Sequence, residues 1–253
     1  MVKKCLNGWW DFYPIYNDDF SMPQEGWLKN AYLVPSVWRK SLECVKRENE
    51  EFFRDANEED LKNIEKLNFL YDEYNYPNEW TKTKNAWVKT NFFIEFVDTD
   101  IQYIIILEAV MPYSKIYING VHVSDFIHPT LPNEIDISDF IKEGNNELAV
   151  LITDYDKDEY GRYMTPTGTM LIAENCGIWQ DVYLCKRDKL HIEDCSIRTY
   201  CENGKIEVIT DIINNGKFNG SIDLYAYIYD KDNKERLFCI GKETFHIEPS
   251  LRQ

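Results

Sequence analysis

The chain has 253 residues, enough for one large β domain or one and a half ordinary domains with a sizeable core. Its formal net charge is −16 and no stripe of Lys and Arg relieves it, which excludes non-specific binding to a nucleic-acid backbone. No run of about 18 apolar residues and no signal-peptide pattern is present, so no membrane association is expected. The seven cysteines show no C-x-x-C spacing, which argues against a zinc site and favours a reducing, cytoplasmic location.

The N-terminal third begins with strand patterns and then changes character. Trp10 and Phe12 lie where a first strand would pack, and Val34-Pro35 predicts an extended segment because proline biases the preceding residue away from helix. From about 40 to 75, apolar residues recur at steps of three to five among many Glu, Lys and Asn residues. This spacing predicts one or two amphipathic helices inserted into a β framework.

Strand patterns return after this insert. A strand is predicted over 86–96, and the nearly continuous apolar run 101–110 predicts a strand buried on both sides. The segment 115–123 predicts a β-hairpin, because its Asn-Gly pair suits the two positive-φ positions of a type I′ turn. A strand over 148–152 with one buried face and a last strand over 177–184 complete the first domain.

The second half of the chain contains a long loop and a second β pattern. Residues 155–175 are polar and interrupted by Gly and Pro, and loops of this length inside compact domains usually have a function. Four further strands are predicted, at 190–200, 205–214, 221–230 and 236–247. An immunoglobulin-like sandwich has about seven strands, so this second domain, 188–253, is expected to be incomplete.

Six motifs occur in a fixed order along the chain: NGWWDF, VPSVW, WVKTNF, KIYINGVHV, DISDFIKEGNNELAV and GIWQDVYL. Together they resemble the N-terminal sugar-binding domain of family-two glycoside hydrolases, the group of β-galactosidases, β-glucuronidases and β-mannosidases. The resemblance covers about residues 6–186, and the residues after it resemble the start of that family's immunoglobulin-like domain. The helical segment and Gln180, where the family commonly has Arg, depart from the pattern and leave the subfamily open.

This resemblance implies an all-β fold with two domains. Residues 1–187 would form a galactose-binding-domain-like jelly-roll sandwich with the helical insert, and 188–253 the incomplete immunoglobulin-like β-sandwich. In a complete enzyme of the family, a (β/α)8 catalytic barrel follows.

The residues needed for catalysis are not found in this pattern. Retaining glycoside hydrolysis needs two carboxylates about 5 Å apart, and in the resembled family both are glutamates on barrel strands, the acid/base following an Asn. Asn-Glu pairs begin here at Asn49, Asn57, Asn78, Asn133 and Asn146, but none follows an apolar barrel-type strand. We therefore predict no catalytic residue and no cofactor in this chain.

We therefore interpret the chain as the noncatalytic N-terminal region of a retaining β-glycosidase. The full-length enzyme would hydrolyse O-glycosidic bonds, and this chain would support the barrel and contribute sugar contacts. Its expected partners are carbohydrate and the catalytic barrel of the same protein.

The resemblance also implies a substrate contact. In related β-galactosidases and β-glucuronidases, an Asp just after the strand corresponding to 148–153 reaches the sugar in the barrel pocket, and Asp154 is the match here. A solvated turn aspartate is the alternative for this residue. His128 and Trp179 are further candidates for sugar contact, although a structural or exposed loop histidine and a packed tryptophan are the more common roles of such residues.

The carboxylates of Asp156 and Asp158 alternate in the acidic loop and suggest calcium. An EF-hand loop needs Gly at its sixth place and an acidic residue at its twelfth, and Glu159 and Thr165 occupy those places here. No metal site is therefore expected.

Two other interpretations remain open. A stand-alone carbohydrate-binding module of the same fold would end at a completed sheet. A β-sandwich interaction protein would instead use the open edges of an incomplete sandwich to pair with another chain, including a second copy of itself.

Overall fold

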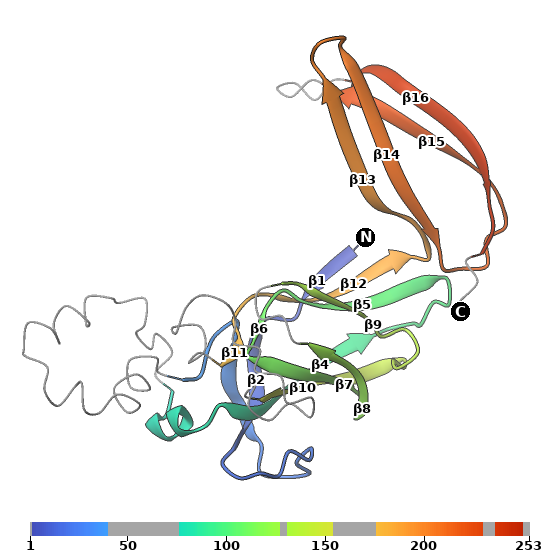
Figure 1. The fold of residues 1–253 in the computed structure, drawn as a ribbon. Helices are drawn as coiled ribbons and strands as arrows, with labels where there is room; N and C mark the ends of the chain where they lie inside the picture. Colours follow the sequence, from blue (N-terminus) through green and yellow to red (C-terminus); the bar gives the residue numbers. More distant parts are fainter. Residues whose placement is uncertain (1, 40–75, 127–130, 154–175, 230–235, 250–253) are drawn as a thin grey trace, which may run out of the picture. The chain divides into compact units, whose positions relative to one another are not determined.

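The computed structural model describes residues 2–39, 76–126, 131–153, 176–229 and 236–249 (Figure 1). No α-helix is present among these residues, so the all-β prediction is confirmed for them. The predicted helical insert at about 40–75 lies outside the described residues. The residues that follow it form a short 3-10 helix, η2 (Asn78–Lys82). None of the helices in this described part is long and apolar enough to cross a membrane.

The described chain divides into two compact units. One unit contains Val2–Val97 and Tyr103–Lys186, and the other contains Asp98–Gln102 and the residues from Arg187 onward. Each unit is described by itself below.

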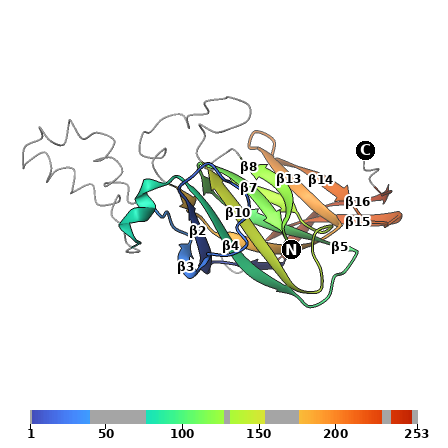
Figure 2. The same cartoon turned by 90° about the horizontal axis from the view of Figure 1, so that it is seen from below.

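The larger sheet of the first unit has six strands, and every neighbouring pair is antiparallel (Figure 2). In order across the sheet they are β3 (Leu28–Val34), β2 (Gly8–Ile15), β4 (Asn85–Ile94), β10 (Gly144–Thr153), β7 (Tyr113–Ile118) and β8 (Val121–Phe126).

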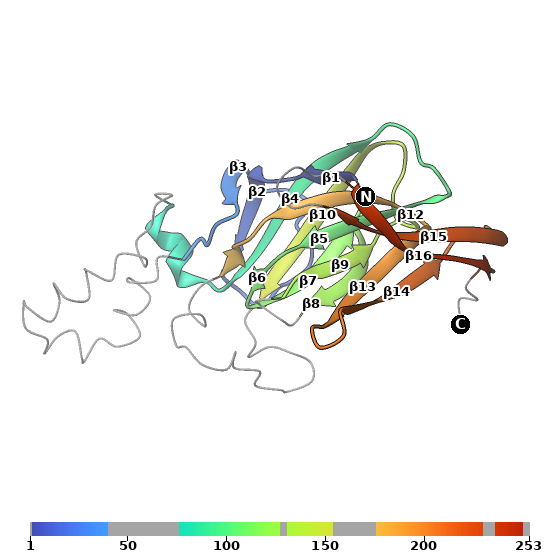
Figure 3. The same cartoon turned by 90° about the horizontal axis from the view of Figure 1, so that it is seen from above.

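A second sheet of four strands lies over one side of the six-stranded sheet (Figures 1 and 3). Its order is β1 (Val2–Cys5), β12 (Val182–Asp188), β5 (Ile101–Leu107) and β9 (Asn133–Asp136). The sides that the two sheets turn toward each other are apolar, and the β5 residues Ile104 to Leu107 are all buried. The prediction of a strand buried on both sides is therefore confirmed.

The predicted single strand over 177–184 is wrong, because the chain there changes partners. β11 (Gly177–Ile178) pairs with β6 (Val110–Met111), whereas β12 pairs with β1. Between them, the backbone N–H of Trp179 donates to the carbonyl of Ala109 at 3.2 Å. Two short strands with an irregular step replace the continuous strand.

The predicted hairpin is confirmed. Asn119 and Gly120 have φ angles of 51° and 81°, as a type I′ turn requires. The flanking residues Ile118 and Val121 pair across β7 and β8. The Asn119 side chain also donates to the carbonyl of Phe140 and accepts the N–H of Glu147 at 3.0 Å, which ties the turn to β10.

The second unit contains two antiparallel pairs of strands. β13 (Leu190–Tyr200) pairs with β14 (Lys205–Asn214), and β15 (Gly220–Tyr229) pairs with β16 (Arg236–Ile247). The four strands predicted here are confirmed. Their assignment to an immunoglobulin-like domain beginning at residue 188 stays a prediction.

Candidate functional site

Most of the predicted contact residues lie outside the described part of the chain. This holds for Asp154, which directly follows the last residue of β10, for His128, and for the metal candidates Asp156 and Asp158. Trp179 is described, and it is half-buried between β11 and β12. Within the described ranges, no three or more metal-ligating side chains come together.

The described residues on either side of the two long undescribed segments are held together by hydrogen bonds. Trp38 N–H donates to the carbonyl of Cys176 at 3.0 Å, and Ser36 N–H donates to that of Ile178 at 2.8 Å. The Trp38 indole N–H also donates to the Thr83 carbonyl at 3.1 Å. Arg39 is the last described residue before one of these segments, and Cys176 is the first described residue after the other. These hydrogen bonds therefore hold the two chain ends side by side.

Buried hydroxyl groups add further hydrogen bonds between these chain segments. Tyr32 Oη donates to the carbonyl of Ser36 at 2.5 Å and accepts the N–H of Ile178 at 2.8 Å. Tyr76 Oη accepts the N–H of Leu33 and lies 2.8 Å from Ser36 Oγ. Burial raises the pKa of Tyr32 far above its usual range, so its hydroxyl stays protonated and can serve as donor and acceptor together.

The six-stranded sheet has a second, outer face, on the side away from the four-stranded sheet. Part of it is covered: Ile15, Trp87 and Leu151 are buried there, although they do not belong to the core between the sheets. The loop between β2 and β3 supplies the cover, and Trp27 is one of its side chains packed on this cluster. The loop is anchored by the Trp87 indole N–H, which donates to the Phe20 carbonyl at 3.2 Å.

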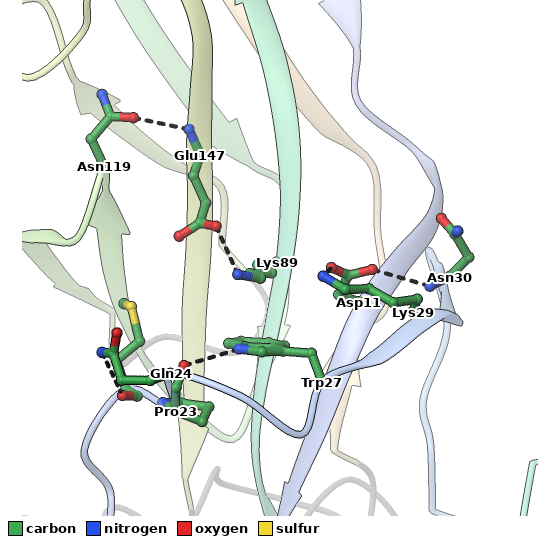
Figure 4. Close-up of polar contacts among 10 residues, drawn as sticks. Asp11, Pro23, Gln24, Trp27, Lys29, Asn30, Lys89, Asn119 and Glu147 are labelled. Carbon is green, nitrogen blue, oxygen red and sulfur yellow. Dashed lines mark hydrogen bonds and ion pairs between the residues drawn. The ribbon is translucent and has the colours of Figure 1, made fainter.

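Charged side chains cross the middle of the outer face (Figure 4). Lys89 Nζ lies 2.8 Å from Glu147 Oε2 and 4.3 Å from the centre of the Trp27 ring. On the neighbouring strand, Asp11 binds Lys29 Nζ at 2.7 Å and the N–H of Asn30 at 3.1 Å. Each carboxylate of this row therefore has a cation beside it.

Aromatic rings continue the outer face toward the sheet edge at β8. The ring centres of Trp87 and Tyr117 lie 5.0 Å apart, and those of Tyr117 and His122 lie 5.2 Å apart. His122 Nε2 lies 2.8 Å from Asp125 Oδ1. Partial burial raises the pKa of Tyr117, which keeps the phenol neutral.

This arrangement lacks the layout for glycoside hydrolysis. Glu147 follows Asn146, as a family acid/base would, yet its carboxylate is bound by Lys89 instead of facing a second carboxylate. Asn146 is buried and hydrogen-bonded within its own turn. Lys89 and Asn91, two residues apart in β4, were the sequence signal for a polar face. The apolar residues around them in the strand made this signal weak.

Comparisons with known proteins agree with this fold. Residues 3–188 match the family described as "Glycosyl hydrolases family 2, sugar binding domain". A β-galactosidase of Priestia megaterium is 26% identical over 229 residues, which is 83% of this chain and 20% of that protein. A β-glucuronidase of Formosa agariphila is 26% identical over 171 residues, which is 61% of this chain and 17% of that protein.

A solved structure supports the same fold. The β-glucuronidase of an uncultured Clostridium species superposes with a TM-score of 0.63 at 18% identity, covering 98% of this chain and 40% of that one. The chain thus spans a minor part of the length of each of these proteins.

Proposed function

Because the chain belongs to the sugar-binding domain family of family-two glycosyl hydrolases, we propose that it is the noncatalytic N-terminal region of a β-glycosidase. The family match over residues 3–188 carries the proposal. Its relatives are named as β-galactosidases and β-glucuronidases, and the chain spans 20% and 17% of two of them. The hydrolytic carboxylates would lie in a barrel outside this chain.

The contribution of this chain would be a sugar contact at the end of β10. Asp154 directly follows this strand, which is hydrogen-bonded on both sides, to β4 and to β7. A rigid strand end is a suitable support for a side chain that must reach a substrate accurately. Cys176, where the described chain resumes, is fixed to Trp38, so both ends of the segment that contains Asp154 are anchored.

Activity measurements test both parts of the proposal. The purified chain should show no turnover of p-nitrophenyl β-galactoside or β-glucuronide, whereas the product of the complete gene should hydrolyse one of them. In that complete protein, Asp154→Asn should lower kcat/KM by about tenfold or more, as expected for the loss of one charged hydrogen bond to substrate. Asp156→Asn is the matched control and should leave kcat/KM within about twofold. Turnover by the chain alone, or an unchanged kcat/KM in Asp154→Asn, would contradict the proposal.

A further inference from the structure

The part of the outer face that the β2–β3 loop leaves uncovered contains two exposed aromatic side chains. Trp9 in β2 is 54% exposed and Phe93 in β4 is 56% exposed. A single exposed aromatic residue is common in soluble proteins. Two on one face of neighbouring strands form a surface that could take a ligand.

The strand register places both rings on the same side of the sheet. Asp11 and Lys89 are directly opposite each other in β2 and β4, and both side chains lie on the outer face (Figure 4). Trp9 is two residues before Asp11, and Phe93 is four residues after Lys89. Side chains alternate between the faces of a strand, so Trp9 and Phe93 share the outer face.

Two amide side chains lie next to Phe93 on this face. Asn91 is on the same face of β4 as Phe93, two residues closer to Lys89, and Asn145 of β10 is directly opposite Phe93. Both are exposed, and neither side chain makes a hydrogen bond to another residue in the described part of the chain. Each amide therefore offers two donors and an acceptor to a ligand. We call Trp9, Asn91, Phe93 and Asn145 the aromatic–amide platform.

We propose that the aromatic–amide platform binds a neutral oligosaccharide, at a place separate from the contact made by Asp154. This inference rests on the proposed sugar-binding function. A sugar ring has a face of C–H groups with partial positive charge, which suits the electron-rich face of Trp9 or Phe93. Its rim of hydroxyl groups donates and accepts hydrogen bonds, as the amides of Asn91 and Asn145 do.

Charge and surface composition select this ligand over others. The chain carries a net charge of −16, so an acidic glycan would be repelled. The apolar core of a protein–protein interface would need a continuous apolar surface. Here the amides of Asn91 and Asn145 lie beside Phe93 on the same face, which favours a ligand that alternates apolar and polar groups.

Calorimetric titration of the purified chain tests the proposal. The probes are cellotetraose, β-1,4-mannotetraose and β-1,4-galactotetraose, with tetragalacturonate as the acidic comparison. At least one neutral probe should bind with a submillimolar Kd and tetragalacturonate should not. Trp9→Ala and Phe93→Ala should each weaken the binding by about tenfold, the size expected for one lost stacking contact. These side chains are exposed, so both variants should fold, which circular dichroism would verify.

Two further variants make the result specific. Phe96→Ala removes another exposed aromatic ring, 64% exposed but outside the platform, and should leave the affinity unchanged. Asp154→Asn should also leave it unchanged in this assay, which separates the platform from the proposed contact at the end of β10.

Three outcomes would overturn the platform proposal. They are the absence of binding by every neutral probe, binding that survives both Trp9→Ala and Phe93→Ala, and an oligomer that Trp9→Ala dissociates while sugar binding is unaffected. The last would assign the surface to a second copy of the chain. Hydrolysis of aryl glycosides by the chain would contradict the proposed function alone and leave the platform standing.

Discussion

Lys89 Nζ lies 4.3 Å from the centre of the Trp27 ring, so a cation from β4 is held beneath an aromatic side chain of the β2–β3 loop. The same ammonium group binds Glu147, and the Lys89 side chain is only 17% exposed. Lys89→Met would remove the cation while keeping most of the apolar chain. We expect it to lower the free energy of unfolding by about 1–2 kcal/mol, measured by urea denaturation.

Lys29 provides the matched control for Lys89. It also pairs with a carboxylate, that of Asp11 at 2.7 Å, but its side chain is 66% exposed. Ion pairs in such exposed positions contribute about 0–1 kcal/mol. Lys29→Met should therefore change stability by less than Lys89→Met, and equal losses would show that the Trp27 contact adds nothing.

Gly177 is closely surrounded by the chain segment that precedes residue 40. A Cβ atom at this position would lie 2.6 Å from the Tyr32 hydroxyl and 2.9 Å from Val37 Cα, and closer still to the Ser36 carbonyl. Gly177→Ala should separate β11 from residues 36–38 and destabilise the first unit by about 3 kcal/mol or more, seen as a lower Tm. Gly120→Ala also has a positive φ, but no other atom is within 4 Å, so its cost should be about 1–2 kcal/mol. A similar Tm for both variants would contradict the steric argument.

Tyr183 and Asp181 are coupled by a hydrogen bond that should make stability depend on pH. Tyr183 Oη donates to Asp181 Oδ2 at 2.7 Å. This bond raises the pKa of Tyr183 from 10.0 to about 12, and it lowers the pKa of Asp181. The folded state therefore favours the neutral phenol. The stability it contributes is complete below pH 10 and lost as the pH rises through about 12.

Thermal unfolding of Tyr183→Phe at several pH values tests this coupling. The difference in Tm from the wild-type chain should be largest below pH 10 and should shrink toward about pH 12. For Asp181→Asn the direction reverses: the carboxylate stabilises above its usual pKa of 3.8, and that contribution disappears as the pH falls below it. A Tm difference that is constant across either range would rule out the coupling.

Local chemistry explains why the strands were predictable. The Asn119-Gly120 turn requires two positive φ angles, and few residue pairs other than Asn-Gly supply them. The composition of β5 predicts its burial, because a continuous apolar run such as Ile104 to Leu107 is stable only when both of its sides are covered by other parts of the protein. These features depend on residues close together in the sequence.

The outer face depends on residues that are distant in the sequence, and for this reason it was not predicted. Trp27 meets Lys89 only after β2 and β4 have paired. Periodicity predicted one buried face for β10, whereas Ala149 and Leu151 on the other face are buried too, since the β2–β3 loop folds over them. The break between β11 and β12 likewise follows from pairing with β6, which the sequence of 177–184 does not encode locally.

Asn146 was one of the Asn-Glu positions considered for catalysis, and the structure gives it a structural role. Its side chain is 1% exposed, and its Oδ1 accepts the N–H of Lys142 and an amide hydrogen of Asn119, both at 2.9 Å. Its Nδ2 donates to the carbonyls of Lys142 at 2.7 Å and Gly144 at 3.2 Å. Asn146→Ala would leave several of these buried groups without partners, so we expect a loss of about 2–3 kcal/mol in urea denaturation. Asn145→Ala, at the exposed neighbouring position, should stay within about 0.5 kcal/mol of wild type. A loss in Asn146→Ala no larger than in Asn145→Ala would show that these bonds do not stabilise the start of β10.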